Sequence, residues 1–83
     1  MLDIKIIGKG CPNCIKLENL CKEIISEKGW EANIEKITDI NKFQDYGVFM
    51  TPGLVVNGKV ISQGKIPVKN TLEYWLEQEI QKH

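Results

Sequence analysis

Residues 2–14 read LDIKIIGKGCPNC and carry the strongest structural signal in the chain. Apolar and polar residues alternate at the start of Leu2–Ile7, which predicts a β-strand, and the glycines that follow end it. Pro12 suits the first turn of a helix, because its missing N–H would have no partner there in any case. Cys11 and Cys14 are therefore predicted to lie where a strand has ended and a helix begins.

Downstream of this junction the pattern predicts a second strand and a second, shorter helix. Apolar residues at helical spacing extend the first helix to Lys28, and Gly29 is expected to stop it. Alternation over residues 30–37 predicts a strand, and residues 39–47 predict a short helix capped by Asp39. Two strands that straddle a helix are expected to run parallel, with a right-handed crossover.

The remaining residues predict an antiparallel hairpin and a final helix. Asn57-Gly58 lies between two apolar runs, and a type I′ turn needs positive φ at both central positions. An apolar stripe then begins at Pro67, and Lys82 complements the dipole near the helix end. The order βαβαββα predicts an α/β protein with one mixed four-stranded sheet flanked by helices, forming a single domain over residues 1–83.

Charge and composition exclude several classes of function. Lys and Arg number 11, Asp and Glu number 11, and the formal net charge is zero. A protein that binds nucleic acid through phosphates normally has a basic excess, so we expect no nucleic acid partner and no polybasic membrane contact. No apolar run approaches the ~20 residues of a membrane span. Asp3 stands where a secretion signal has basic residues, so we expect the protein to stay in the cytoplasm. We also expect it to be a monomer.

The chemistry of the chain centres on Cys11-Pro12-Asn13-Cys14. The three cysteines are an odd number, which disfavours a structural disulfide framework. The thiolate of Cys11 would be favoured by the unpaired N–H groups and the dipole at a helix N-terminus. Cys14 lies close enough to form a disulfide with it, which predicts an exposed nucleophilic thiol beside a shielded resolving thiol. Cys21 falls on the apolar stripe of the first helix and is expected to be structural.

A metal-binding module that uses the same two thiolates is the alternative function. A zinc site needs two further ligands, and the candidates are Cys21 and the last residue, His83. A copper chaperone domain of βαββαβ order also places C-x-x-C after its first strand. Such domains normally have Met where Lys9 stands, and a strand where residues 39–47 predict a helix. We therefore assign no metal ligand.

The C-x-x-C motif of residues 11–14 after a first strand, with Thr51-Pro52 ahead of a hairpin, resembles the thioredoxin fold. The short chain is most similar, over residues 2–81, to small thioredoxin-like and glutaredoxin-like redox-active disulfide proteins. The resemblance implies a thiol–disulfide oxidoreductase without an organic cofactor. It also implies protein disulfide substrates, and an upstream reductase or small thiol that resets the enzyme.

Carried over by position, the resemblance implies a role for each site residue. Cys11 would be the attacking thiol and Cys14 the resolving thiol. Pro52 would be the cis-proline that faces them, and Thr51 would pair with substrate through its backbone. Val48, Phe49 and Met50 precede this pair, and they are candidates for an apolar docking patch beside the thiols.

Three departures from the family pattern leave the reductant and substrate open. Thioredoxin's active-site Trp and Gly-Pro pair are missing, and the Pro-x order is glutaredoxin-like. The Gly-Gly glutathione-binding signature of glutaredoxins is absent, because residues 62–65 read SQGK. The buried Asp that assists proton transfer in thioredoxin has no clear counterpart, and Glu31 and Glu35 are the candidates.

Overall fold

The computed structural model describes residues 1–81. Its elements are β1 (Leu2–Ile7), α1 (Pro12–Lys28), β2 (Ala32–Ile37), the 3₁₀ turns η1 (Ile40–Lys42) and η2 (Gln44–Tyr46), β3 (Gly53–Val56), β4 (Lys59–Gln63) and α2 (Lys69–Gln81). Lys82 and His83, predicted above as a helix-dipole charge and a candidate zinc ligand, lie outside the described residues.

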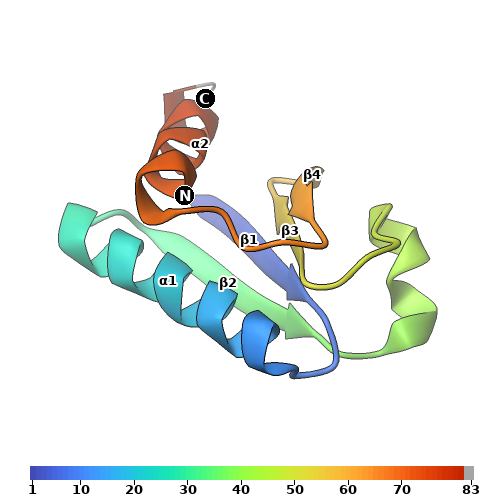
Figure 1. The fold of residues 1–83 in the computed structure, drawn as a ribbon. Coiled ribbons are helices and arrows are strands. Elements are labelled where there is room, and N and C mark those ends of the chain that lie inside the picture. The colour runs from blue at the N-terminus through green and yellow to red at the C-terminus, as the bar shows by residue number, and fades with distance from the viewer. Residues whose placement is uncertain (82–83) are drawn as a thin grey trace.

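The strands form one mixed four-stranded sheet in the order β2-β1-β3-β4 (Figure 1). β1 and β2 run parallel, and α1 forms the crossover between them. β3 runs antiparallel to both β1 and β4. The predicted fold class is therefore confirmed. The β3–β4 turn has the predicted geometry, with φ of 52° at Asn57 and 83° at Gly58.

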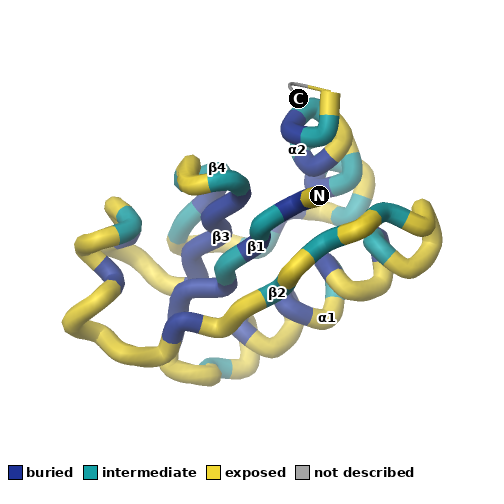
Figure 2. Tube along the Cα trace, turned by 180° about the vertical axis from the view of Figure 1, so that it is seen from behind, coloured by how far each residue is buried: buried dark blue, intermediate teal, exposed yellow. Residues whose placement is uncertain are grey.

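The two faces of the sheet have separate apolar cores. Both helices pack on one face, where Leu17 and Ile24 of α1 and Leu72 of α2 join side chains of β1 and β3. On the other face Phe43, from the η1–η2 segment, packs with Ile7 and neighbouring apolar side chains. Figure 2 shows buried residues concentrated along the two central strands. Apolar side chains therefore pack on both faces of the sheet near the carboxyl end of β1. Cys11 comes shortly after this end in the chain.

Helix α1 matches the predicted bounds, and Gly29 ends it in a left-handed conformation with φ of 67°. β2 begins at Ala32, because Trp30 instead donates its backbone N–H to Ile25 in the turn that closes α1. The final helix begins at Lys69, two positions after the predicted start at Pro67.

The prediction of a short α-helix over residues 39–47 is wrong, because this segment forms two 3₁₀ turns. Asp39 does cap the first turn, where its Oδ1 accepts the Asn41 N–H at 3.0 Å. The Phe43 N–H then bonds to Ile40 at 3.2 Å, in the shorter 3₁₀ pattern, and Gly47 ends the segment with φ of 79°. Phe43, which lies between the two turns, packs into the core. The segment is short, and short α-helices have little stability of their own.

Candidate active site

Cys11 and Cys14 are joined by a disulfide at the start of α1, with their Cα atoms 5.1 Å apart. Cys11 is the N-cap residue of the helix, and its Sγ accepts the Cys14 N–H at 3.2 Å. Its carbonyl accepts the Ile15 N–H at 3.1 Å. The same helix terminus that orients the disulfide would stabilise negative charge on the Cys11 sulfur after reduction.

The two sulfurs differ in their access to solvent. Cys11 is partly exposed, whereas Cys14 is only 4 % exposed. Cys14 is covered by the backbone of Gly8, at the end of β1. A Cβ atom added at Gly8 would overlap the Cys14 Sγ, so this close packing of Cys14 needs a glycine at position 8. An incoming disulfide can therefore reach Cys11 more easily than Cys14.

Gly8→Ala is expected to displace Cys14, and to cost about 1–3 kcal/mol of unfolding free energy in the reduced protein, as overpacked cores do. Urea unfolding measures this cost. In a Cys14→Ala background the offending Sγ is gone, and the nearest remaining contact of the new Cβ is 3.4 Å. The cost should therefore shrink in the double mutant. An equal cost in both backgrounds would show that Gly8 does not act through Cys14.

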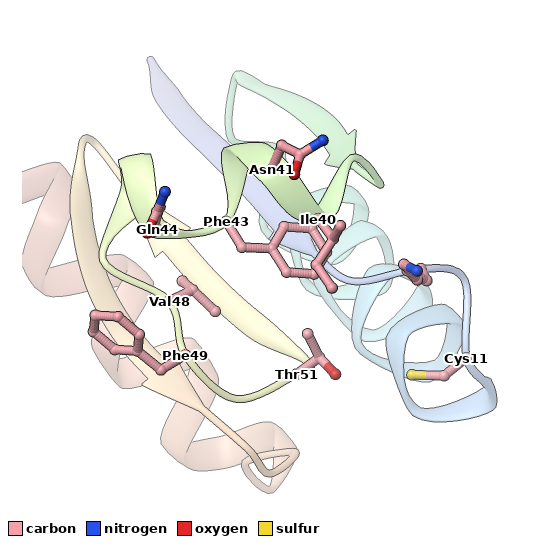
Figure 3. Close-up of a pocket in the computed structure, with 9 residues that line it drawn as sticks. Cys11, Ile40, Asn41, Phe43, Gln44, Val48, Phe49 and Thr51 are labelled. Atoms are coloured by element: carbon pink, nitrogen blue, oxygen red, sulfur yellow. The ribbon is translucent and has the colours of Figure 1, made fainter.

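The Thr51–Pro52 peptide bond is cis, as the resemblance implied. Pro52 is buried and Thr51 is exposed. Thr51 and Cys11 line the same open groove of about 610 Å³ (Figure 3). The structure thus brings Cys11 and Thr51 to one groove, with Cys14 bonded to Cys11 and Pro52 directly after Thr51.

Residues of the η1–η2 segment and of the loop before Thr51 form the other wall of the groove. Ile40, Phe43, Val48 and Phe49 contribute apolar side chains, and Lys9 contributes a cation. Phe49 is 82 % exposed and Met50 is 58 % exposed, whereas Val48 is buried in the core. The apolar surface next to the disulfide is therefore built from part of the predicted patch, and from Ile40.

A buried acid that the sequence did not single out lies next to Cys14. Glu18, one helical turn further along α1, lines a cavity of about 130 Å³ together with Cys14 and Lys36 of β2. Its carboxylate pairs with Lys22 at 3.0 Å and with Lys36 at 3.7 Å. The hydrogen bond from Lys22 lowers the pKa of Glu18 below its ordinary value, so this carboxylate is ionised near neutral pH.

The two acids named from the sequence do not occupy this position. Glu31 and Glu35 are both exposed, and Glu35 pairs with Lys5 at 3.5 Å. The helical spacing between Cys14 and Glu18 was the available signal, since residues four apart share a helix face.

Cys21 is a free thiol inside the core. Burial raises its pKa to about 12, and the negative charge of Glu18 adds to the rise. The thiol is therefore protonated at neutral pH. It packs with Leu17 and Ile24, in the position predicted for it.

Within residues 1–81, no group of three or more His, Cys, Asp or Glu side chains is arranged to hold a metal ion. The strand that a copper chaperone domain has after its second strand is replaced here by the 3₁₀ turns of residues 40–46. No helix of the described chain has the length and apolar character needed to cross a membrane.

A surface disulfide that can open and close at the N-terminus of a fixed helix is suited to thiol–disulfide exchange. With the cis-proline beside it and the mixed sheet beneath it, the site is that of a thiol–disulfide oxidoreductase. The chain belongs to the thioredoxin family, because the model of the Thioredoxin domain family matches residues 2–77.

Curated relatives and solved structures agree with this assignment. The chain is 37 % identical to a thioredoxin of Methanocaldococcus jannaschii over 81 residues, which cover 93 % of each chain. It is 34 % identical to a thioredoxin of Methanothermobacter thermautotrophicus, over 88 % of this chain and 95 % of the relative.

Two solved thioredoxins share the fold. Thioredoxin-2 of a malaria parasite aligns with a TM-score of 0.67 at 14 % identity, over 94 % of this chain and 82 % of its own. Deadhead of Drosophila melanogaster aligns with a TM-score of 0.64 at 18 % identity, over 93 % and 79 % of the two chains.

Proposed function

We propose that Cys11 is the attacking thiol and Cys14 the resolving thiol in disulfide exchange with protein substrates. The observation that carries this assignment is the difference in exposure between the two sulfurs. Cys11 is partly exposed and caps α1, whereas Cys14 is buried behind Gly8. A helix N-terminus stabilises a thiolate at the exposed position, where a substrate disulfide arrives first.

The exchange proceeds in two steps that conserve electrons and sulfur atoms. The Cys11 thiolate attacks one sulfur of the substrate disulfide, which forms a mixed disulfide and releases the other substrate sulfur as a thiolate. The Cys14 thiolate then attacks the Cys11 Sγ, which closes the Cys11–Cys14 disulfide and releases the second substrate thiol. Two electrons have passed to the substrate, and this chain uses no organic cofactor in the exchange. An upstream reductase or small thiol then supplies two new electrons, which reduce the Cys11–Cys14 disulfide again.

Thr51 provides the backbone contact for the substrate in this proposal. Among residues 1–81, no partner hydrogen-bonds to its backbone N–H or C=O. Its side chain lines the groove with Cys11 (Figure 3). An extended substrate strand can therefore pair with Thr51 in the manner of an added β-strand, while Pro52, which has no N–H, lies buried beneath it.

Compartment and assembly belong to the same proposal. We place the enzyme in the cytoplasm, where a buried free thiol such as Cys21 is kept reduced. We also expect it to act as a monomer. Cell fractionation and sedimentation at micromolar concentration test these two statements.

Selective alkylation tests the assignment of the two thiols. The reduced protein, treated briefly with iodoacetamide at pH 7, should be labelled at Cys11, with Cys14 and Cys21 largely unmodified. Peptide mass mapping reads the sites, and labelling after unfolding shows that all three thiols can react. In parallel, the unmodified protein should accelerate reduction of insulin by dithiothreitol. First labelling at Cys14, or no acceleration, would contradict the proposal.

A further inference from the structure

The segment from Val48 to Pro52 leads into the cis bond and forms one wall of the active-site groove. It has no regular secondary structure. Val48 and Pro52 at its two ends are buried, but Phe49 and Met50 between them are exposed, so side-chain packing contributes little to the shape of the middle of the segment. The backbone there is held by hydrogen bonds to other parts of the chain. At its start, the Val48 N–H donates to the Phe43 carbonyl at 3.1 Å.

The next two backbone donors converge on one side chain. Gln63, the last residue of β4, accepts the Phe49 N–H at 2.8 Å and the Met50 N–H at 3.2 Å through the same Oε1 atom. Both donors are N–H groups, so the atom that faces them must be the amide oxygen. Since β4 belongs to the sheet, Gln63 connects an irregular loop to a rigid element.

The residue after Gln63 adds a third attachment. The Gly64 N–H donates to the Pro52 carbonyl at 3.0 Å. Gly64 has a φ of 78°, and an added Cβ would lie 3.2 Å from the Met50 Cβ. Gln63 and Gly64 together hold the residues on either side of Thr51, while the backbone of Thr51 itself stays unbonded within residues 1–81.

We infer that Gln63 is a positioning residue for substrate binding, which holds the Phe49–Met50 backbone so that Thr51 presents its free N–H and C=O to an extended substrate. The inference rests on the proposed pairing of substrate with Thr51. Gln63 touches neither the substrate nor the reacting sulfurs in this assignment. It acts by fixing the groove wall before binding, so that ordering of the segment does not reduce the affinity for substrate.

The test compares two isosteric changes at the same position. Gln63→Met keeps the length of the side chain but removes the acceptor. Gln63→Glu keeps an oxygen acceptor for both N–H groups and should behave like the wild type. Gln78→Met makes the same chemical change on α2, at a partly exposed position outside the groove, and controls for the loss of any surface amide.

The expected signature separates long from small substrates. Gln63→Met should raise the KM for insulin about three- to tenfold, which is the loss of one to two ordinary hydrogen bonds, with little change in kcat. Its reaction with the small disulfide 5,5′-dithiobis(2-nitrobenzoate), which does not pair with Thr51, should be unchanged. The reduction potential of the Cys11–Cys14 pair should also be unchanged, whereas a general loss of structure would alter all three quantities.

Hydrogen exchange of the unmodified protein provides a second measurement that does not depend on a variant. The Phe49 and Met50 amides lie in an exposed loop, and protection of both by NMR is expected if Gln63 holds them in solution. Exchange of both at the rate of an unstructured chain would overturn the inference, as would an unchanged insulin KM in folded Gln63→Met. In either case the wild type would still reduce insulin through Cys11, so failure of this inference is distinguishable from failure of the proposed function.

Discussion

Cys11→Ser should reduce insulin at the uncatalysed rate, whereas Cys14→Ser should accumulate a covalent complex with its substrate. The hydroxyl that replaces the thiol in the first variant is not a nucleophile towards a disulfide at neutral pH, so the first step is lost completely. In the second variant the Cys11 thiolate still attacks, but no neighbouring thiolate can release the mixed disulfide. Turnover is therefore lost in both variants, and only one of them traps substrate.

Non-reducing electrophoresis and mass spectrometry detect the trapped species. Cys14→Ser incubated with insulin should gain the mass of an insulin chain, and dithiothreitol should remove it. Cys21→Ala is the matched control, since it removes a cysteine of the same helix that lies in the core. It should keep its activity. If Cys11→Ser formed the stable complex and Cys14→Ser did not, the two roles would have to be exchanged.

The parts of the site that the sequence predicted are those fixed by short stretches of chain. The junction of strand and helix places Cys11 at the N-cap through local geometry, because Pro12 begins the helix and glycines end the strand. Asn57-Gly58 likewise fixes the β3–β4 turn with its own dihedral angles. Thr51-Pro52 was found by resemblance, since nothing local to it specifies that it faces the thiols.

The parts that sequence reasoning missed depend on contacts between distant elements. Gln63 lies 14 residues from Phe49, and its hydrogen bond becomes visible only when β4 is placed beside the loop. In the sequence, Glu18 is one of several charged residues on a helix. In the structure, Lys36 of β2 pairs with it, and it lines a cavity together with Cys14 and Gly8. Val48 and Phe49 are adjacent and both apolar, yet one is buried and the other is 82 % exposed.

The largest predicted effect on stability comes from Cys21, at alkaline pH. Burial raises the pKa of this thiol to about 12 from its ordinary 9.0, with a further contribution from the charge of Glu18. Between these two values the unfolded chain has released the proton and the folded protein still holds it. Folding is then coupled to the uptake of one proton, so the free energy of unfolding falls as pH rises above about 9.

The size of the fall follows from the separation of the two values. Each pH unit costs about 1.4 kcal/mol, and the full separation amounts to about 4 kcal/mol by pH 12. Below pH 8 the thiol is protonated in both states and contributes no pH dependence. Cys21→Ala removes the titration altogether, and at pH 7 it should cost only about 1 kcal/mol for the small cavity that it leaves.

The two stability curves should therefore cross. Cys21→Ala is expected to be the less stable protein at pH 7 and the more stable one at pH 11, by about 1–2 kcal/mol. Urea unfolding from pH 7 to pH 11 measures the difference, in which lysine titrations common to both proteins cancel. Both proteins carry Cys11→Ser and Cys14→Ser, so that no disulfide can be exchanged by the ionised Cys21. A difference that stays constant over this range would show that the folded protein does not hold the Cys21 proton, and the thiol would then be accessible to water rather than enclosed between α1 and the sheet.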